Sequence, residues 1–314
     1  MISQRDKRNC VLIIANIARG GADIRYIQML LGHKDLKTAH IYSCCGHRHD
    51  PAGEDALLFS QQHLCSPHPS PSLVYYMRVE EMTSPAFKSA VETDPVVIIP
   101  VGALEEHGPH LPLATDTIQP TAVIEEAAKR TGALVMPMFG YGLCSSTQNF
   151  PGTVSLSFDT MRSFAMDVVK ELARNGVRRM IFVSGHAGRA HMMALKEGAK
   201  QAVKDVEEEL AVLVLSDYDF AYSRGDMEED DGHAGMLETS RILALRPDLV
   251  GHERPACHPV FPRFRILKDA SPLFPEGVHG DTARASAEYG QEVNRDIIES
   301  LVRLIEETKK TKIL

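Results

Sequence analysis

The sequence predicts an α/β domain with a mostly parallel sheet over residues 73–314, preceded by a short helical segment and a linker. Apolar runs typical of buried strands alternate here with segments of helical periodicity, and that alternation builds parallel sheets. The run "PVVIIPV" (95–101) is continuously apolar and rich in β-branched residues. Such a run indicates a strand that is buried on both faces of its sheet.

The other elements follow in order. We expect a helix over 118–130, a strand over 133–139, and a helix over about 159–175 that ends at the C-cap pair Asn175-Gly176. A strand over 178–185, a helix over 190–208 and a strand over 210–216 complete the pattern. Ligands of such sheets bind beyond the carboxyl ends of the strands. Residues 105–116, 184–188 and those after Ser216 should therefore share one rim.

The composition excludes several classes of protein. A formal net charge of −8 over 314 residues argues against a nucleic-acid partner. Six Cys in a chain this long do not form a disulfide scaffold. The sequence has no apolar run of membrane-spanning length and no signal-peptide pattern. We therefore expect a cytoplasmic protein without membrane or nucleic-acid contact.

The stretch "GALEEHGPHLPLATDT" (102–117) places metal-binding side chains directly after the first strand. Glu105 and His107 are two residues apart, so they share a face of an extended segment. The prolines stiffen a loop that can return Asp116 beside them. Mixed His and carboxylate ligands suit Zn, Mn or Fe better than Ca. Taken alone, however, the loop is also compatible with a polar surface segment and a helix N-cap.

Two further clusters strengthen the metal interpretation. "VSGHAGRA" places His186 directly after a buried strand, between small residues that allow a tight turn. "DGHAGMLETS" presents His233, with Glu238 five residues later and about one helical turn away. A single His usually has only a structural role. Three separate clusters of acidic and His residues, all at strand ends, are much less likely to arise by chance.

From about 77 to 306 the chain resembles the creatininase (creatinine amidohydrolase) family. The resemblance rests on "PVGALEEHGPHLPLATD", "FPGT", "SGHAGR", "HAGMLETS" and "GVHGDTARASAEYG", in matching order and spacing. It implies a three-layer α/β/α sandwich, a homo-oligomer (a hexamer) and two divalent metal ions, Zn first, with Mn or Fe as alternatives. The implied metal ligands are Glu105, His107, Asp116 and His186, with Asp116 bridging the ions.

The same resemblance implies a catalytic role for His233, and for Glu238 a role as catalytic acid, metal ligand or support for a ligand. The implied activity is hydrolysis of a C–N bond, other than an ordinary peptide bond, in a small cyclic amide or formamide by a metal-activated water. Arg189 is placed to meet an anionic substrate group, unless it is a surface residue at the start of a helix.

Departures from creatininase proper leave alternatives open. Gly188 stands where that enzyme has a Glu, Gly232 stands where it has a second Glu, and the chain contains no Trp. The alternatives within the family are a formamide deformylase of archaeal riboflavin or deazaflavin biosynthesis and a peptidase acting on a modified peptide. A metal-binding protein without activity is the third.

The first 48 residues carry a resemblance to a different family. "GADIRYIQMLLGHKDLKTAHIYS" (within 18–43) resembles the C-terminal end of tyrosine recombinases, with His33 and Tyr42 at active-site positions. The segment lacks the upstream cations that such a site needs to stabilise phosphate charge. We therefore expect residues 1–48 to be a non-catalytic remnant, a fusion scar or a mis-assigned start, and residues 49–72 to be a disordered linker. A DNA-binding recombinase fragment is the remaining alternative.

Overall fold

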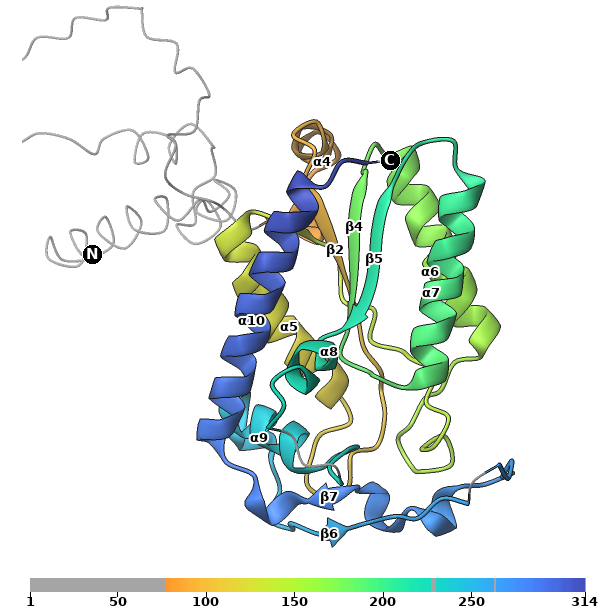
Figure 1. The fold of residues 1–314 in the computed structure, drawn as a ribbon, viewed down its shortest axis with the longest axis vertical. Coiled ribbons are helices and arrows are strands. Elements are labelled where there is room, and N and C mark those ends of the chain that lie inside the picture. The colour runs from red at the N-terminus through yellow and green to blue at the C-terminus, as the bar shows by residue number, and fades with distance from the viewer. Residues whose placement is uncertain (1–76, 227–229, 263, 314) are drawn as a thin grey trace, which may run out of the picture. The chain divides into compact units, whose positions relative to one another are not determined.

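The computed structural model describes residues 77–226, 230–262 and 264–313 (Figure 1). The recombinase-like segment and the predicted linker lie outside these residues. Five parallel strands form the central sheet in the order β1-β3-β2-β4-β5. They are β1 Met77–Arg78, β2 Val96–Val101, β3 Leu134–Val135, β4 Arg179–Ser184 and β5 Ala211–Ser216.

Helices cover both faces of this sheet and give the three layers that the sequence predicts (Figure 1). One face is covered by α5 Thr115–Thr131, α8 Tyr218–Tyr222, α9 Met236–Leu245 and α10 Ala287–Lys310. The other is covered by α4 Ser84–Val91, α6 Phe158–Arg174 and α7 Arg189–Asp205. An antiparallel pair, β6 Ala256–Cys257 and β7 Gly280–Asp281, and five short 3-10 helices complete the described residues: η1 Val79–Glu81, η2 Pro247–Leu249, η3 Ser271–Leu273, η4 Pro275–Gly277 and η5 Thr282–Arg284.

Strand β2 shows why the sheet is buried on both sides. Val97, Ile99 and Val101 pack in the core beneath α6 and α7, whereas Val96 and Ile98 pack beneath α5 and α10. Successive side chains of a strand point to opposite faces, so a continuously apolar strand serves two cores. In the part of the chain described, no helix combines the length and apolar character that crossing a bilayer would require.

The register of the sheet aligns three strand ends. Val101 of β2 pairs with Ser184 of β4, and Ser184 pairs with Ser216 of β5. The chain leaves all three strands at the same edge, as expected from the sequence. The loops that follow them carry the candidate site.

Several boundaries differ from the prediction. The strand expected over 133–139 has ladder pairing only at Leu134–Val135, although Phe139 still bridges to Val101. The Met136 N–H donates to the Ile98 carbonyl and the next donor, the Phe139 N–H, to the Pro100 carbonyl, so β3 has one extra residue here and the ladder is interrupted. Helix α5 begins three residues earlier than expected, and α7 ends three residues earlier. The start of α5 matters most, because it places Asp116 inside the helix.

Candidate metal centre and active site

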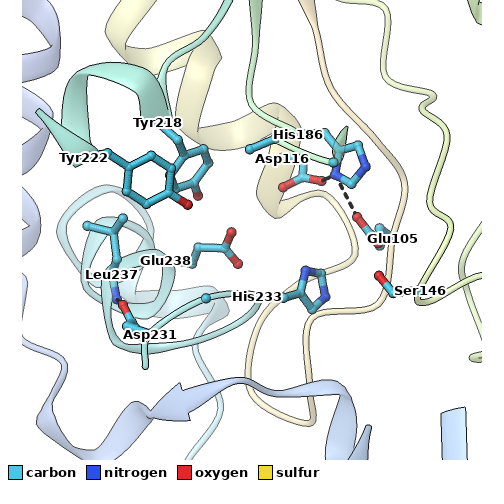
Figure 2. A pocket seen from close by; sticks show the side chains of 13 residues that line it. Glu105, Asp116, Ser146, His186, Tyr218, Tyr222, Asp231, His233, Leu237 and Glu238 are labelled. Atoms are coloured by element: carbon cyan, nitrogen blue, oxygen red, sulfur yellow. Dashed lines mark hydrogen bonds and ion pairs between the residues drawn. The ribbon is translucent and has the colours of Figure 1, made fainter. Parts of the chain in front are cut away.

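The structure brings six of the predicted site residues into one cluster beyond the carboxyl edge of the sheet. All of them except His107 are labelled in Figure 2. Two of them follow β2, one lies in α5, one follows β4, and two belong to the loop before α9 and its first turn. The carboxylates and two of the imidazoles are buried, and His233 is partly exposed. The six residues are Glu105, His107, Asp116, His186, His233 and Glu238.

Asp116 lies at the centre of the cluster. Its Oδ1 is 3.2 Å from Nε2 of His107, and its Oδ2 is 3.0 Å from Nδ1 of His186. The first turn of α5 presents this carboxylate, rather than the stiffened loop that we expected from the sequence. A carboxylate with each oxygen facing a different imidazole has the arrangement of a ligand shared by two cations.

Backbone carbonyl groups orient the two imidazoles. Nδ1 of His107 lies 3.0 Å from the carbonyl oxygen of Glu105, and Nε2 of His186 lies 3.0 Å from that of Leu143. A carbonyl oxygen only accepts hydrogen bonds, so these ring nitrogens are the donors. The other nitrogen of each ring faces the carboxylates. Hydrogen bonding of one ring nitrogen to a carbonyl is how proteins commonly orient a metal-binding His.

Within this six-residue cluster, two carboxylate oxygens remain without a hydrogen bond. The hydroxyl of Thr147 donates to Oε1 of Glu105, but neither Oε2 of Glu105 nor Oδ2 of Asp116 accepts a hydrogen bond. Both oxygens are buried and approach Nδ1 of His186 to 3.0 Å. Buried anionic oxygens are normally satisfied, so these two can accept a cation in the place of a proton on His186.

The electrostatics of the cluster agree with this interpretation. Burial opposes charge on His107, but the Asp116 carboxylate outweighs it and raises the pKa of His107 to about 10. Burial would likewise raise the pKa of Glu105, but His186 lowers that pKa to about 2. The carboxylates thus attract positive charge into a buried site. Protons supply that charge to the free protein, and divalent cations can replace them.

Glu238 and His233 lie on the cavity side of this cluster. Oε2 of Glu238 is 3.5 Å from Nε2 of His107 and accepts a hydrogen bond from the Ala234 N–H at 2.7 Å. Nε2 of His233 donates to the Glu106 carbonyl oxygen at 2.7 Å, and its ring centroid is 4.3 Å from that of His107. Glu238 therefore holds the turn that carries His233, and it also faces the cluster.

Potential ligand atoms fall into three groups in the described residues, each with its atoms within 4.8 Å of one another. One group contains His107, Asp116 and Glu238, and another contains Glu105, His107 and His233. We predicted that His233 acts in catalysis and is not a metal ligand. In the structure His233 lies closer to the candidate ligands than that role requires. The third group contains Glu105, His186 and Cys144, a residue that the sequence did not single out.

A cavity of about 200 Å³ opens beside the cluster. Tyr218, Tyr222 and Leu237 form one wall, across from His186 and Glu105 (Figure 2). We expected the segment after Ser216 on this rim, and α8 confirms it. Arg189, the predicted substrate-binding residue, is exposed at the start of α7 and does not line the cavity.

Other residues of the cavity were missed. Ser146 and Asp231 also line it, and Asp231 accepts hydrogen bonds from the N–H groups of Met236 and Leu237 at the start of α9. Ser146 lies in a loop without a recognisable motif. Asp231 adjoins the "GHAG" motif, so its position before a helix was the available signal.

Together, the fold and the cluster define a three-layer α/β enzyme with a His and carboxylate centre at the carboxyl edge of its parallel sheet. Residues 80–305 match the family model described as "Creatininase: Creatinine amidohydrolase". The chain therefore belongs to the creatininase family, a family of metal-dependent amidohydrolases that act on C–N bonds.

The alignment with two named relatives covers nearly the whole length of each relative. The chain is 34% identical to the creatinine amidohydrolase of Pseudomonas putida, over 73% of this chain and 96% of that one. It is 29% identical to a mycofactocin precursor peptide peptidase of Mycobacterium ulcerans, over 74% of this chain and 94% of that one.

Solved structures agree in fold. A creatininase described as a manganese form aligns with a TM-score of 0.69 and 33% identity, over 74% of this chain and 98% of that one. A mutant creatininase described as a Zn–Zn type aligns with a TM-score of 0.67 and 34% identity, over 73% of this chain and 97% of that one.

Proposed function

We propose that this protein hydrolyses a C–N bond of a small cyclic amide or formamide at a centre of two divalent ions. One observation carries the proposal: the two oxygens of Asp116 face His107 and His186 separately, at 3.2 and 3.0 Å. Asp116 would be shared by both ions, Glu105 and His186 would complete one half-site, and His107 and Glu238 the other. The manganese and Zn–Zn forms of related creatininases support divalent ions here.

Divalent ions bound at this centre would polarise the substrate carbonyl and lower the pKa of a water molecule. Proton transfer and positioning of the substrate would depend on residues of the protein itself. His233 faces the cavity with Nε2 held by the Glu106 carbonyl, so its Nδ1 is available to transfer a proton to the leaving nitrogen. Tyr218 donates its hydroxyl hydrogen to Gln119 at 2.8 Å, which fixes the ring against the cavity. The buried walls restrict water near the reacting bond.

The cavity volume favours a small substrate. About 200 Å³ is below the usual range of drug-sized pockets, and it suits a compact amide or formamide better than a folded chain. The peptidase that resembles this chain supports a second candidate, hydrolysis of a modified peptide. A peptide terminus would enter the same cavity, with the remainder of the peptide outside. A formamide deformylase uses the same groups and differs only in substrate.

Metal content and turnover test the proposal together. The full-length protein, purified without chelator, should contain about two equivalents of divalent metal by elemental analysis and turn over a member of a panel of cyclic amides and formamides. Asp116→Ala should lose both ions, since its two oxygens serve both half-sites. Asp159→Ala, an exposed acid at the start of α6, is the matched control and should retain both.

Full metal occupancy in Asp116→Ala would refute the shared carboxylate. Metal binding without turnover of any amide, formamide or peptide in the panel would favour the inactive metal-binding alternative.

A further inference from the structure

Cys144 lies in the loop after β3, directly against the metal centre. The residue has no exposed surface, and its backbone N–H donates to Oγ of Ser155 at 3.0 Å. The preceding residue, Leu143, donates its N–H to Nδ1 of His191 and accepts a hydrogen bond from Nε2 of His186. The position of the thiol is therefore set by the contacts that orient a predicted metal-binding imidazole.

The thiol sulfur, a carboxylate oxygen of Glu105 and a ring nitrogen of His186 lie within 4.8 Å of one another. Thr147 occupies Oε1 of Glu105, whereas Oε2 is buried and accepts no hydrogen bond. Small side-chain rotations bring three such atoms within bonding distance of one ion, given Zn–S and Zn–N distances of about 2.3 and 2.0 Å. Independently of the sulfur, the buried Glu105 oxygen leaves a coordination position for a cation here.

We propose that Cys144 is a metal ligand at the half-site of Glu105 and His186, an assignment that rests on the two-ion centre proposed above. Binding replaces the thiol proton with a metal–sulfur bond, and the proton leaves to solvent. A thiolate ligand also makes the two half-sites unequal. The half-site of His107, Asp116 and Glu238 contains only nitrogen and oxygen donors, and its carboxylates suit Mn, whereas a thiolate ligand favours Zn over Mn.

Cobalt substitution tests this assignment on the full-length protein. Metal is removed with a chelator, Co²⁺ is added, and the near-ultraviolet thiolate-to-cobalt charge-transfer absorption is recorded. The wild-type protein should show this band, and Cys144→Ser should lose the part of it that Cys144 contributes. Cys257→Ser, which changes the partly buried thiol of β6, is the matched control and should leave the band unchanged. The four Cys before residue 77 are present in every variant, so difference spectra cancel them.

Metal affinities provide a second measurement. Zn²⁺ affinity should fall roughly 10–100-fold or more in Cys144→Ser, because loss of a supporting partner alone has effects of that size. Mn²⁺ affinity should change less than about threefold, since carboxylate and imidazole suffice for that ion. Cys144→Ala should behave as Cys144→Ser does, and a melting temperature close to wild type shows that each variant is folded.

The outcomes separate the two proposals. Bound cobalt with an identical charge-transfer band in Cys144→Ser overturns the thiolate ligand and leaves the two-ion centre in place. Parallel losses of Zn²⁺ and Mn²⁺ affinity also overturn it, because they indicate a packing defect. Failure of the wild-type protein to bind Co²⁺, Zn²⁺ or Mn²⁺ overturns the two-ion centre itself, and the ligand with it.

Discussion

Replacing Gly185 with Ala should weaken both the fold and the metal centre. A Cβ atom at position 185 would lie 2.2 Å from the carbonyl oxygen of Asp116 and 2.6 Å from the ring of Pro120. Normal van der Waals separation is about 3.5 Å, so α5 must move away from the end of β4 by roughly 1 Å. That displacement moves the Asp116 carboxylate relative to His186, which follows β4.

The expected magnitude follows from this overlap. Forcing an extra methyl group into a packed site costs about 1–3 kcal/mol. For a domain of this size each kcal/mol lowers the melting temperature by about 2–4 °C, so Gly185→Ala should melt roughly 2–12 °C lower than wild type. Its metal affinity should fall at least about tenfold, as for loss of support to a ligand.

Thermal unfolding in chelator, followed by metal titration, measures the two effects separately. Gly140→Ala is the control, because a Cβ there meets only a Thr117 methyl group, at 3.3 Å. An unchanged melting temperature and metal affinity in Gly185→Ala would refute the argument that this glycine lets α5 approach the sheet. A similar loss in Gly140→Ala would assign the effect to the loss of glycine in general.

Two further predictions concern His233 and His110. His233→Ala should retain both metals while its turnover falls roughly 10²–10⁴-fold. Glu238→Gln, in contrast, should lose metal. Metal loss in His233→Ala, or unchanged turnover of that variant, would show that the two roles are wrongly assigned. Burial, assisted by the charge of Arg254, lowers the pKa of His110 to about 4, so between pH 6.5 and 4 the unfolded chain binds a proton that the native state does not. Stability should therefore fall on acidification through that window, by up to about 3 kcal/mol from this residue. In urea titrations at a series of pH values His110→Gln should show a shallower slope, and an identical slope would contradict this assignment.

The sequence predicted the sheet well because its signals are local. The apolar run of β2 is sufficient to indicate two buried faces, and the shared rim follows from parallel strands alone. The three motifs around Glu105, His186 and His233 could be recognised because each adjoins a strand or helix end. The resemblance to a known family then indicated which of their side chains belong together.

What the sequence did not predict depends on contacts between distant segments. Thr147 lies 42 residues from Glu105 and belongs to a loop without periodicity or a motif, so nothing local announces its hydrogen bond. Cys144 likewise has no local sequence signal that indicates its position beside the candidate metal centre. The sequence indicated that Asp116 lies beside Glu105 and His107, but it did not indicate that a helix presents this residue. The prolines before Asp116 suggested a loop, and we expected the helix to begin only at Ile118.

The glycine at position 188 takes on a different meaning in the structure. In the sequence it appeared as a missing acid, since creatininase proper has a Glu there. A Cβ at 188 would lie 2.6 Å from Nε2 of His186, the nitrogen that donates to the Leu143 carbonyl. In this backbone a side chain at 188 would displace the imidazole that the proposed centre needs. Glu238 reaches Nε2 of His107 from α9 instead, at 3.5 Å. The acid at 238 and the glycine at 188 are therefore compatible features of one centre, and the departure at 188 is no argument against metal binding.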